Sequence, residues 1–557
     1  MFRIRWLLRV FLPSFFLFSS LFVQAQQGST PPEAPSDAQS AAARDASQPQ
    51  GSLLLVLPFE NHTGQPNLDW IGSGAADIFN RRLDAAGFLT ITRDDRLYAL
   101  DRLGLPLNFR PSRATTIRIA QLLDADFVII GDYTLTGTQL AASARILNLH
   151  QLTLSPPITE QAGLNGILDT FNRLAWDVAR KLDPTYSVAE QTFLAADGPL
   201  RPDAFENYIR GMIAEAPADR ITHLRESVRL SPGFTPALLE LGRAYFANQD
   251  YDDAATAFGQ MPRDDPRALE ADFYRGLSLF YTGKYLLAQD AFAFVASQLP
   301  LPEVVNNEGV AASRRGRDGT AFFRQAIASD PRDADYHFNL AIALRKHNDI
   351  PGAISELETD LKLHPQDSEA QTFLAALQKP GPQLTTAAAT SAQSAATDES
   401  LPLERIKRTY NETEFRQAAY EMEQLQEARI AVLPPEQRAQ RLVASGDQFL
   451  RRGLILEAER EYQAALKAYP LSALAHAGLA QVRERSFDLR AARAEAQQSL
   501  QLASNVPAYL VLARLDLHAN QLSAAASEVG HALKLEPANA DALGMKHAVE
   551  AKGQQVP

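Results

Sequence analysis

The chain has 557 residues, of which 66 are acidic and 54 are basic, and its formal net charge is −12. This acidic balance argues against a general nucleic-acid-binding protein, which needs a basic face. The chain contains no cysteine, which excludes disulfides, cysteine-ligated metal sites and thiol catalysis and says nothing about the compartment.

The first 25 residues have the pattern of a secretory signal peptide. Arginines at positions 3, 5 and 9 precede the apolar run Val10–Val23, and a small-x-small cleavage sequence ends at Ala25. The run is short for a membrane span. We therefore expect residues 1–25 to be a signal peptide and the mature chain to be periplasmic or secreted, without a transmembrane span. An uncleaved amino-terminal anchor is the alternative.

Residues 26–50 are rich in Ala, Ser, Pro, Gln and Asp and have almost no large apolar side chains. Such a segment buries too little apolar surface to offset its chain entropy, so it is predicted to be a disordered linker.

Residues 51–184 are predicted to form an α/β domain. Leu53–Leu57 is a continuous apolar run that ends at Pro58, which is typical of a buried strand. Further strands are predicted at Phe88–Thr92, Phe127–Tyr133 and Gln139–Leu149. Apolar residues at helical spacing predict helices at Trp70–Ala86, Arg96–Leu103, Arg113–Leu123 and Gly166–Leu182. Helices that alternate with strands indicate a compact α/β domain.

Three motifs of this domain carry a family resemblance. They are Leu57–Gly64 (LPFENHTG), Asp69–Gly72 (DWIG) and Ala125–Tyr133 (ADFVIIGDY). These motifs resemble the TolB amino-terminal-like domain, which is often found ahead of tetratricopeptide repeats in bacterial envelope proteins. The resemblance covers this domain alone, because nothing downstream resembles the propeller that follows it in TolB. It implies an envelope protein, and TolB's own partners do not carry over.

Residues 200–379 contain a pattern that recurs at positions 34 residues apart. The recurring residues are a glycine, an alanine, a phenylalanine and a proline: Gly242, Ala254, Phe258 and Pro266, then Gly276, Ala288, Phe292 and Pro300. The segment resembles tetratricopeptide repeats, each an antiparallel pair of helices. The glycine lets the second helix approach closely, and the proline ends each unit. A helical solenoid is therefore predicted.

Beyond the first repeats, residues 380–400 form an Ala/Ser/Thr/Gln tract and are predicted to be a flexible linker. In residues 401–435, the apolar spacing from Leu403 to Val432 predicts a long amphipathic helix that ends at Pro434. Repeats resume in residues 436–551, which are expected to finish with a capping helix because terminal repeats need a polar outer face.

The candidate binding site is the groove of the first repeats. In tetratricopeptide repeats the first helices of the units line a concave face, and this resemblance implies a partner-binding groove that contains Arg243, Phe246, Phe273, Phe280, Asn339, Arg345 and Lys346. Aromatic side chains flanked by arginines are typical anchors of protein interfaces. Asn339 occupies the position at which some repeats bind a carboxylate of their ligand, although asparagine is also common at this position in units that bind no ligand. For the aromatic residues, interhelix packing is the alternative.

No catalytic or cofactor motif is found. The ten histidines form no H-E-x-x-H, and G-x-S-x-G does not occur. Gly72–Gly74 lacks the third glycine of a dinucleotide site, and His337 is expected to be a packing residue.

The sequence therefore predicts a non-enzymatic exported scaffold, without cofactor or metal, that binds proteins or peptides and no nucleic acid. The alternative is a small-molecule sensor or enzyme. Under this alternative hypothesis, a polar cavity bordered by Asn61, Asp69 and Asp132 binds the small molecule, and the repeats dock other proteins.

Overall fold

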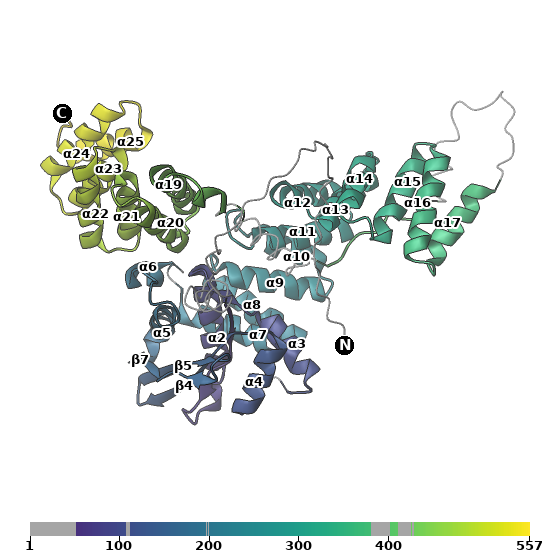
Figure 1. Cartoon of the computed structure of the whole chain (residues 1–557), viewed down its shortest axis with the longest axis horizontal. Helices are drawn as coiled ribbons and strands as arrows, with labels where there is room; N and C mark the ends of the chain where they lie inside the picture. Colours follow the sequence, from purple (N-terminus) through teal and green to yellow (C-terminus); the bar gives the residue numbers. More distant parts are fainter. Residues whose placement is uncertain are drawn as a thin grey trace, which may run out of the picture. The chain divides into compact units, whose positions relative to one another are not determined.

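The computed structural model describes residues 52–106, 112–196, 198, 200–379, 401–409, 425 and 428–557. The predicted signal peptide and the predicted linkers at 26–50 and 380–400 lie outside these residues. The described chain forms an α/β domain followed by two arrays of paired helices, which confirms the predicted fold class (Figure 1). None of the helices in the described ranges is long and apolar enough to cross a membrane.

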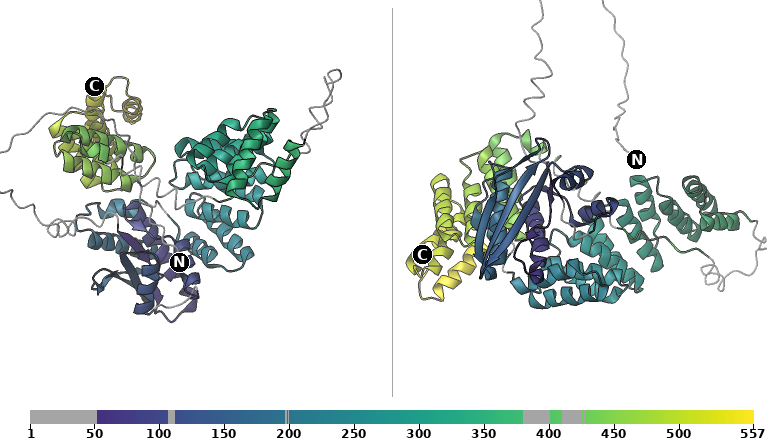
Figure 2. Two further views of the ribbon diagram at one scale, coloured as in Figure 1. Left: turned by 45° about the vertical axis from the view of Figure 1, so that its right-hand side comes forward. Right: turned by 90° about the horizontal axis from the view of Figure 1, so that it is seen from below.

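A seven-stranded sheet lies at the centre of the α/β domain (Figure 2). Its order is β3-β1-β4-β5-β6, with β2 beside β4 and β7 beside β5. Strand β1 is parallel to β3 and β4, whereas β5 is antiparallel to β4, β6 and β7. The strands are β1 (Leu53–Val56), β2 (Glu60–Asn61), β3 (Leu89–Thr90), β4 (Phe127–Thr136), β5 (Gln139–Asn148), β6 (Thr153–Leu154) and β7 (Ile158–Gly163). Strands β2, β6 and β7 were not predicted from the sequence.

Helices cover both faces of this sheet. Leu54 and Val56 of β1 share a core with helices α2 and α5. Leu55 and Leu57 share a second core with α3 and α4. Successive residues of a strand point to opposite faces, so β1 is buried on both sides, and this is why its sequence is apolar throughout. The helices are η1 (Pro66–Leu68), α2 (Trp70–Ala85), α3 (Arg93–Arg102), α4 (Arg113–Leu122), η2 (Leu164–Gly166), α5 (Ile167–Leu182) and α6 (Glu190–Ala195).

The three motifs of the α/β domain meet at Phe59. Its N–H donates to the carbonyl oxygen of Gly72 at 3.1 Å, and a Cβ at Gly72 would lie 2.2 Å from the carbonyl oxygen of Phe59. A Cβ at Gly131 would lie 2.3 Å from the Phe59 ring. Both positions therefore require glycine so that α2 and β4 can approach Phe59 closely.

The first array consists of eleven helices in the described residues. Its helices are α7 (Pro202–Ile213), α8 (Pro217–Leu230), α9 (Thr235–Ala247), α10 (Tyr251–Gly259), α11 (Ala268–Tyr281), α12 (Tyr285–Gln298), α13 (Pro302–Arg314), α14 (Thr320–Ser329), α15 (Ala334–Lys346), α16 (Ile350–Leu363) and α17 (Ser368–Gln378). A Cβ at Gly242 would lie 2.5 Å from the Phe258 ring. The same relation holds between Gly276 and Phe292, at 2.7 Å. The recurring glycine is thus needed where an aromatic ring of the paired helix packs.

The second array repeats this packing. A Cβ at Gly446 would lie 2.7 Å from the ring of Tyr462, which takes the place of the phenylalanine. The helices are α19 (Pro435–Arg451), α20 (Ile455–Ala468), α21 (Ala473–Arg485), α22 (Leu489–Leu502), α23 (Val506–His518), α24 (Leu522–Leu535) and α25 (Ala540–Glu550).

The predicted amphipathic helix does not begin at Leu403. Residues 402–409 form neither helix nor strand, and residues 410–424 lie outside the described part of the chain. Residues 402–409 instead lie against the first array. Peptide groups of this segment form hydrogen bonds with side chains of the array and not with one another as in a helix.

Candidate functional site

Residues 401–409, called the docked segment below, lie against the first helices of the last units of the first array. The segment bonds to α13 and α15, and it reaches the amino-terminal end of α17. These helices carry part of the groove in which partner binding was predicted. In the described structure, the groove is therefore occupied by a segment of the same chain.

Buried asparagines hold the main chain of the docked segment. The side chain of Asn339 accepts a hydrogen bond from the N–H of Arg405 at 2.7 Å and donates one to its carbonyl oxygen at 2.8 Å. Asn307 makes the same pair of bonds with Lys407, both at 2.8 Å. Asn306 also donates to the carbonyl oxygen of Arg405, at 3.1 Å. The bonded residues alternate, as they do between paired strands, so the groove recognises an extended chain through its peptide groups.

Glu404 lies in a basic site next to this asparagine row. The hydroxyl of Ser313 donates to its Oε1, and Nζ of Lys346 lies 2.7 Å from the same atom. Nε of Arg314 lies 3.2 Å from Oε2. Burial by itself raises the pKa of Glu404, but the hydrogen bonds from Lys346 and Ser313 bring it below its ordinary value. The site therefore favours a charged carboxylate.

Arg405 enters an acidic pocket. Its guanidinium lies 2.6 Å from Asp367 and 3.1 Å from Glu369. It also lies over the ring of Phe338, 3.6 Å from the centroid, which favours a cation. Burial by itself lowers the pKa of Arg405, but hydrogen bonds to Asp367 and Glu369 raise it above its ordinary value. The pocket thus stabilises a positive charge.

The next two residues of the docked segment use an apolar and an acidic site. Ile406 belongs to two apolar clusters that also contain Phe280. Nζ of Lys407 lies 2.6 Å from carboxylate oxygens of both Asp333 and Asp335. The groove therefore has successive subsites for an acidic residue, an arginine, an aliphatic residue and a lysine.

Asp360 is the least satisfied member of the acidic pocket. Its side chain is fully buried, and neither carboxylate oxygen accepts a hydrogen bond from the described residues. The nearest guanidinium nitrogen of Arg405 lies 3.7 Å away. Burial, together with the charge of Asp367, raises the pKa of Asp360 to about 6.

Three of the predicted groove residues lie at the docked segment: Asn339 and Lys346 bond to it, and Phe280 shares its apolar clusters. Phe273 belongs to an apolar cluster against which Ile406 packs, and its fully buried ring also packs against Phe292 of the paired helix, with ring centroids 5.9 Å apart. As a partner contact, Phe273 remains a prediction.

For the other predicted groove residues, the contacts described are with helices of the array. Arg243 is ion-paired with Glu270 of the following unit, and Phe246 packs against Tyr274 with ring centroids 5.4 Å apart. Arg345 is half-buried near the end of α15. As partner contacts, these three residues remain predictions.

Asn306, Asn307 and the acidic pocket were not predicted from the sequence. Asn306 lies 33 residues before Asn339 and bonds to it, so the repeat period was a signal that could have identified it. No local signal pointed to the docked segment, because Lys407 lies 100 residues from Asn307 in the chain.

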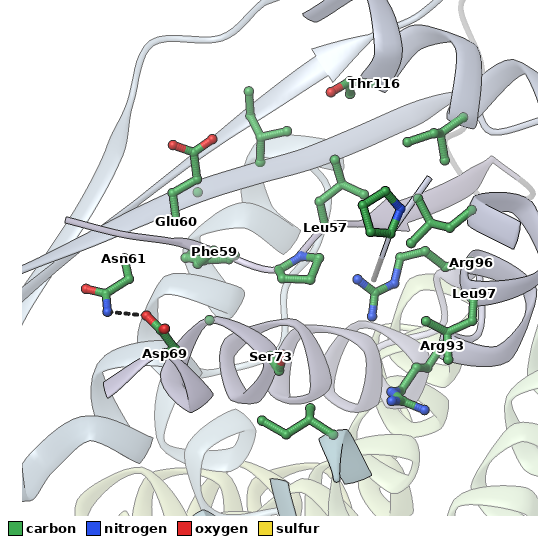
Figure 3. Close-up of a pocket in the computed structure, with 18 of the residues that line it drawn as sticks. Leu57, Phe59, Glu60, Asn61, Asp69, Ser73, Arg93, Arg96, Leu97 and Thr116 are labelled. Atoms are coloured by element: carbon green, nitrogen blue, oxygen red, sulfur yellow. Dashed lines mark hydrogen bonds between the residues drawn. The ribbon is translucent and has the colours of Figure 1, made fainter. Parts of the chain in front are cut away.

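A second candidate site is a cavity of about 680 Å³ in the α/β domain, lined by the end of β1 and by α2, α3 and α4 (Figure 3). Strand β1 lies between β3 and β4, so the cavity is at a switch in strand order, where open α/β sheets bind ligands. Asn61 and Asp69 line it, as the alternative reading expected. Asp132 does not line it; its carboxylate accepts a hydrogen bond from Ser143 at 3.0 Å.

Arginines give this cavity a positive wall. Arg93, Arg96 and Arg113 all line it, and Figure 3 labels Arg93 and Arg96 on one side of the cavity. Arg96 is only 9% exposed, and burial, with the charge of Arg93 adding to it, lowers its pKa to about 10. Leu97 and Leu100 supply apolar wall. Glu60, Asp69 and Glu215 also line the cavity, so a small organic anion is suited only to the side on which the arginines lie. Among the described residues, no group of three or more His, Asp or Glu side chains could hold a metal ion.

Two family models, both described as tetratricopeptide repeat, match parts of the chain. One matches residues 210–272 and 311–377, and the other matches residues 443–507. Both arrays therefore contain tetratricopeptide repeats. No curated protein matches the chain.

Solved structures that are similar to parts of the chain include three examples. A MamA fragment from Desulfovibrio magneticus RS-1 is 21% identical and covers 30% of this chain and 100% of its own, with a TM-score of 0.28. YrrB, described as a TPR protein with an unusual peptide-binding site, is 15% identical and covers 31% and 90%, with a TM-score of 0.29. The LpoB C-terminal domain from Salmonella enterica is 18% identical and covers 22% and 91%, with a TM-score of 0.19.

Proposed function

We propose that this protein is a non-enzymatic, exported scaffold of the cell envelope that binds segments of other proteins in the grooves of its tetratricopeptide-repeat arrays. The observation that supports this function is the asparagine row, in which Asn339 and Asn307 bond to the N–H and carbonyl groups of alternate residues of the docked segment. Bonds to peptide groups form with any extended chain. The groove is therefore equipped to hold protein segments.

Export and an envelope location are supported by the sequence. The first 25 residues have the order of a secretory signal peptide, and the α/β domain carries motifs that resemble the TolB amino-terminal-like domain. Fractionation of cells that produce the full chain, with amino-terminal sequencing of the product, tests both. We expect a periplasmic protein or a protein in the medium that begins after Ala25. A full-length product in the cytosolic fraction contradicts the proposal.

Partner binding is tested by capture from an envelope extract onto the purified chain. The matched variant combines Asn307→Ala and Asn339→Ala, which removes the paired main-chain bonds of these two asparagines and changes only side chains that are fully buried. We expect proteins that the wild-type chain retains saturably and the double variant loses. Equal retention by the two proteins would show that the groove is not the binding surface.

A second function is favoured by the cavity of the α/β domain, in which buried Arg96 lies beside Arg93. In this alternative, the domain binds a small organic anion and the repeats dock a partner. An anionic ligand would offset the repulsion between the two arginines. Thermal melting of the full chain with phosphate, citrate or a nucleoside monophosphate tests it. A saturable rise in Tm that Arg96→Met abolishes supports this function, and an unchanged Tm with all three contradicts it.

A further inference from the structure

The docked segment has the contacts of a ligand rather than those of a repeat helix. In the sequence it lies between the two arrays, after the end of α17 at Gln378 and before the start of α19 at Pro435. Its peptide groups bond to asparagine side chains of α13 and α15, at sequence separations of 66 to 100 residues. A second chain with the same extended backbone would find the same donors and acceptors.

The side-chain subsites restrict which segment fits. Glu404 is bound by Ser313 and Lys346. Arg405 is bound by Asp367 and Glu369, and the lysine site is formed by Asp333 and Asp335. Between the two basic residues, Ile406 fills an apolar site. A segment with an acidic residue, an arginine, an aliphatic residue and a lysine in this order matches every subsite.

The fit of the chain's own segment is incomplete at one point. Asp360 is fully buried, and both of its oxygens lack a hydrogen bond within the described structure. The guanidinium of Arg405 instead bonds to Asp367 and stays 3.7 Å from Asp360. A buried carboxylate without a hydrogen bond is costly. An incoming segment whose arginine reaches Asp360 would therefore bind this pocket better than the docked segment does.

We propose that the docked segment is an internal competitor, and that the groove binds a partner protein through an exposed, extended segment of the pattern acidic–Arg–aliphatic–Lys, which must displace Glu404–Lys407. This inference rests on the scaffold function proposed above and adds the chemistry of the partner and a means of control. A tethered ligand is present at an effective concentration on the order of millimolar when its linker is short and flexible. A free segment of equal affinity therefore binds weakly until the docked segment is released.

The test uses the full chain and a fluorescein-labelled peptide with the sequence of residues 401–409, followed by fluorescence polarisation. The released variant carries Arg405→Glu and Lys407→Glu, which places two acidic side chains against the acidic subsites and leaves the groove itself unchanged. A charge-matched control carries Arg324→Glu and Lys362→Glu, at exposed positions of α14 and α16. Circular dichroism verifies that all three proteins are folded.

We expect the released variant to bind the peptide at least tenfold more tightly than the wild-type chain, and the control to behave like the wild type. Adding Asn339→Ala to the released variant should abolish the gain, and a peptide with glutamate at the positions of Arg405 and Lys407 should not bind. Equal binding by the wild-type and released chains would overturn the proposal, as would binding that survives Asn339→Ala.

A second measurement needs no variant. Hydrogen exchange of the wild-type chain is followed by mass spectrometry with and without a large excess of the unlabelled peptide. Displacement predicts faster exchange at the amides of Arg405 and Lys407, whereas unchanged exchange at saturating peptide overturns the proposal. If light scattering shows a wild-type dimer that the released variant loses, the occupant is a second copy of this chain, and the assignment to a partner protein fails.

The two proposals fail in different ways. If peptide exchange occurs in solution while the groove captures no protein from an envelope extract, the scaffold function is contradicted and the exchangeable site remains. If the groove captures a partner while the peptide never exchanges, the scaffold function remains and the internal competitor is contradicted.

Discussion

Asn339 and Arg405 are 66 residues apart in the chain, yet the amide of the first bonds to both the N–H and the carbonyl oxygen of the second. The contact recognises the backbone, so by itself it does not select a sequence. Selection comes from the neighbouring side chains, because Glu404 is held by basic and hydroxyl groups and Arg405 by carboxylates. Different residues of the groove therefore bind the backbone of a segment and select its sequence.

The first prediction concerns Asn339→Ala. This change leaves the N–H of Arg405 without its partner and removes one of the two hydrogen bonds to its carbonyl oxygen, and an unsatisfied buried group costs about 1–3 kcal/mol. Amides of the docked segment should therefore exchange with solvent roughly tenfold faster or more, as measured by hydrogen exchange and mass spectrometry. Gln325→Ala, at an exposed position of α14, is the control and should leave the exchange unchanged. Equal protection in both variants would show that Asn339 does not hold the segment.

The second prediction concerns the recurring glycine. Gly242→Ala places a Cβ 2.5 Å from the Phe258 ring, and this overpacking should destabilise the first array by about 1–3 kcal/mol. Gly544→Ala in α25 is the matched control, because no atom lies within 4 Å of its Cβ. There, alanine should stabilise the helix by up to about 1 kcal/mol. Thermal melting measures both, and a Gly242→Ala protein as stable as the wild type would contradict the packing argument.

The third prediction concerns pH and Asp360. The pKa of Asp360 in the folded chain is about 6, above its ordinary value of 3.8, because burial and the charge of Asp367 disfavour the ionised form. The charged form therefore destabilises the fold, and stability should rise as the pH falls through about 6 towards 4. Asp360→Asn removes this charge and should stabilise the chain at pH 8 by on the order of 1–2 kcal/mol.

Other groups titrate nearby, so the difference between the variant and the wild type is the quantity to measure. The hydrogen bond to Glu356 raises the pKa of His337, and the stability it adds is lost as the pH rises through that value. The pKa values of Asp367 and Glu404 are lowered, so their contributions are lost only in stronger acid. Glu358→Gln, at an exposed position of α16, is the control. The advantage of Asp360→Asn should shrink from pH 8 to pH 5, and an advantage that is constant with pH would contradict the assignment.

The repeat architecture could be predicted from the sequence because its signal is local and periodic. Gly242 and Phe258 lie in one unit, and their contact is the same one that Gly276 and Phe292 make. Strands with long apolar runs, such as Leu53–Val56, were identified because a continuous apolar run is also a local signal. Strands β2 and β6 have only two residues each, which is too short for any periodicity to show.

The candidate site could be predicted only in part. Asn339 and Lys346 were identified from their position in a unit, whereas the ring of Phe273 is fully buried in the core beside the groove. The docked segment was predicted to be helical because its apolar residues continue a helical spacing. Its structure depends on Asn307 and Asn339, which are distant in the chain, and local spacing carries no information about such partners.

The central claim is that the groove of the first array holds segments of other proteins. It is tested most directly by photo-crosslinking in intact cells from Phe280, which shares two apolar clusters with Ile406 of the docked segment, compared with Arg324 on α14. The account predicts crosslinks to a partner protein from position 280 only, and more of them when Arg405→Glu and Lys407→Glu release the docked segment. Crosslinks to no other protein from position 280, with the segment either docked or released, would contradict it.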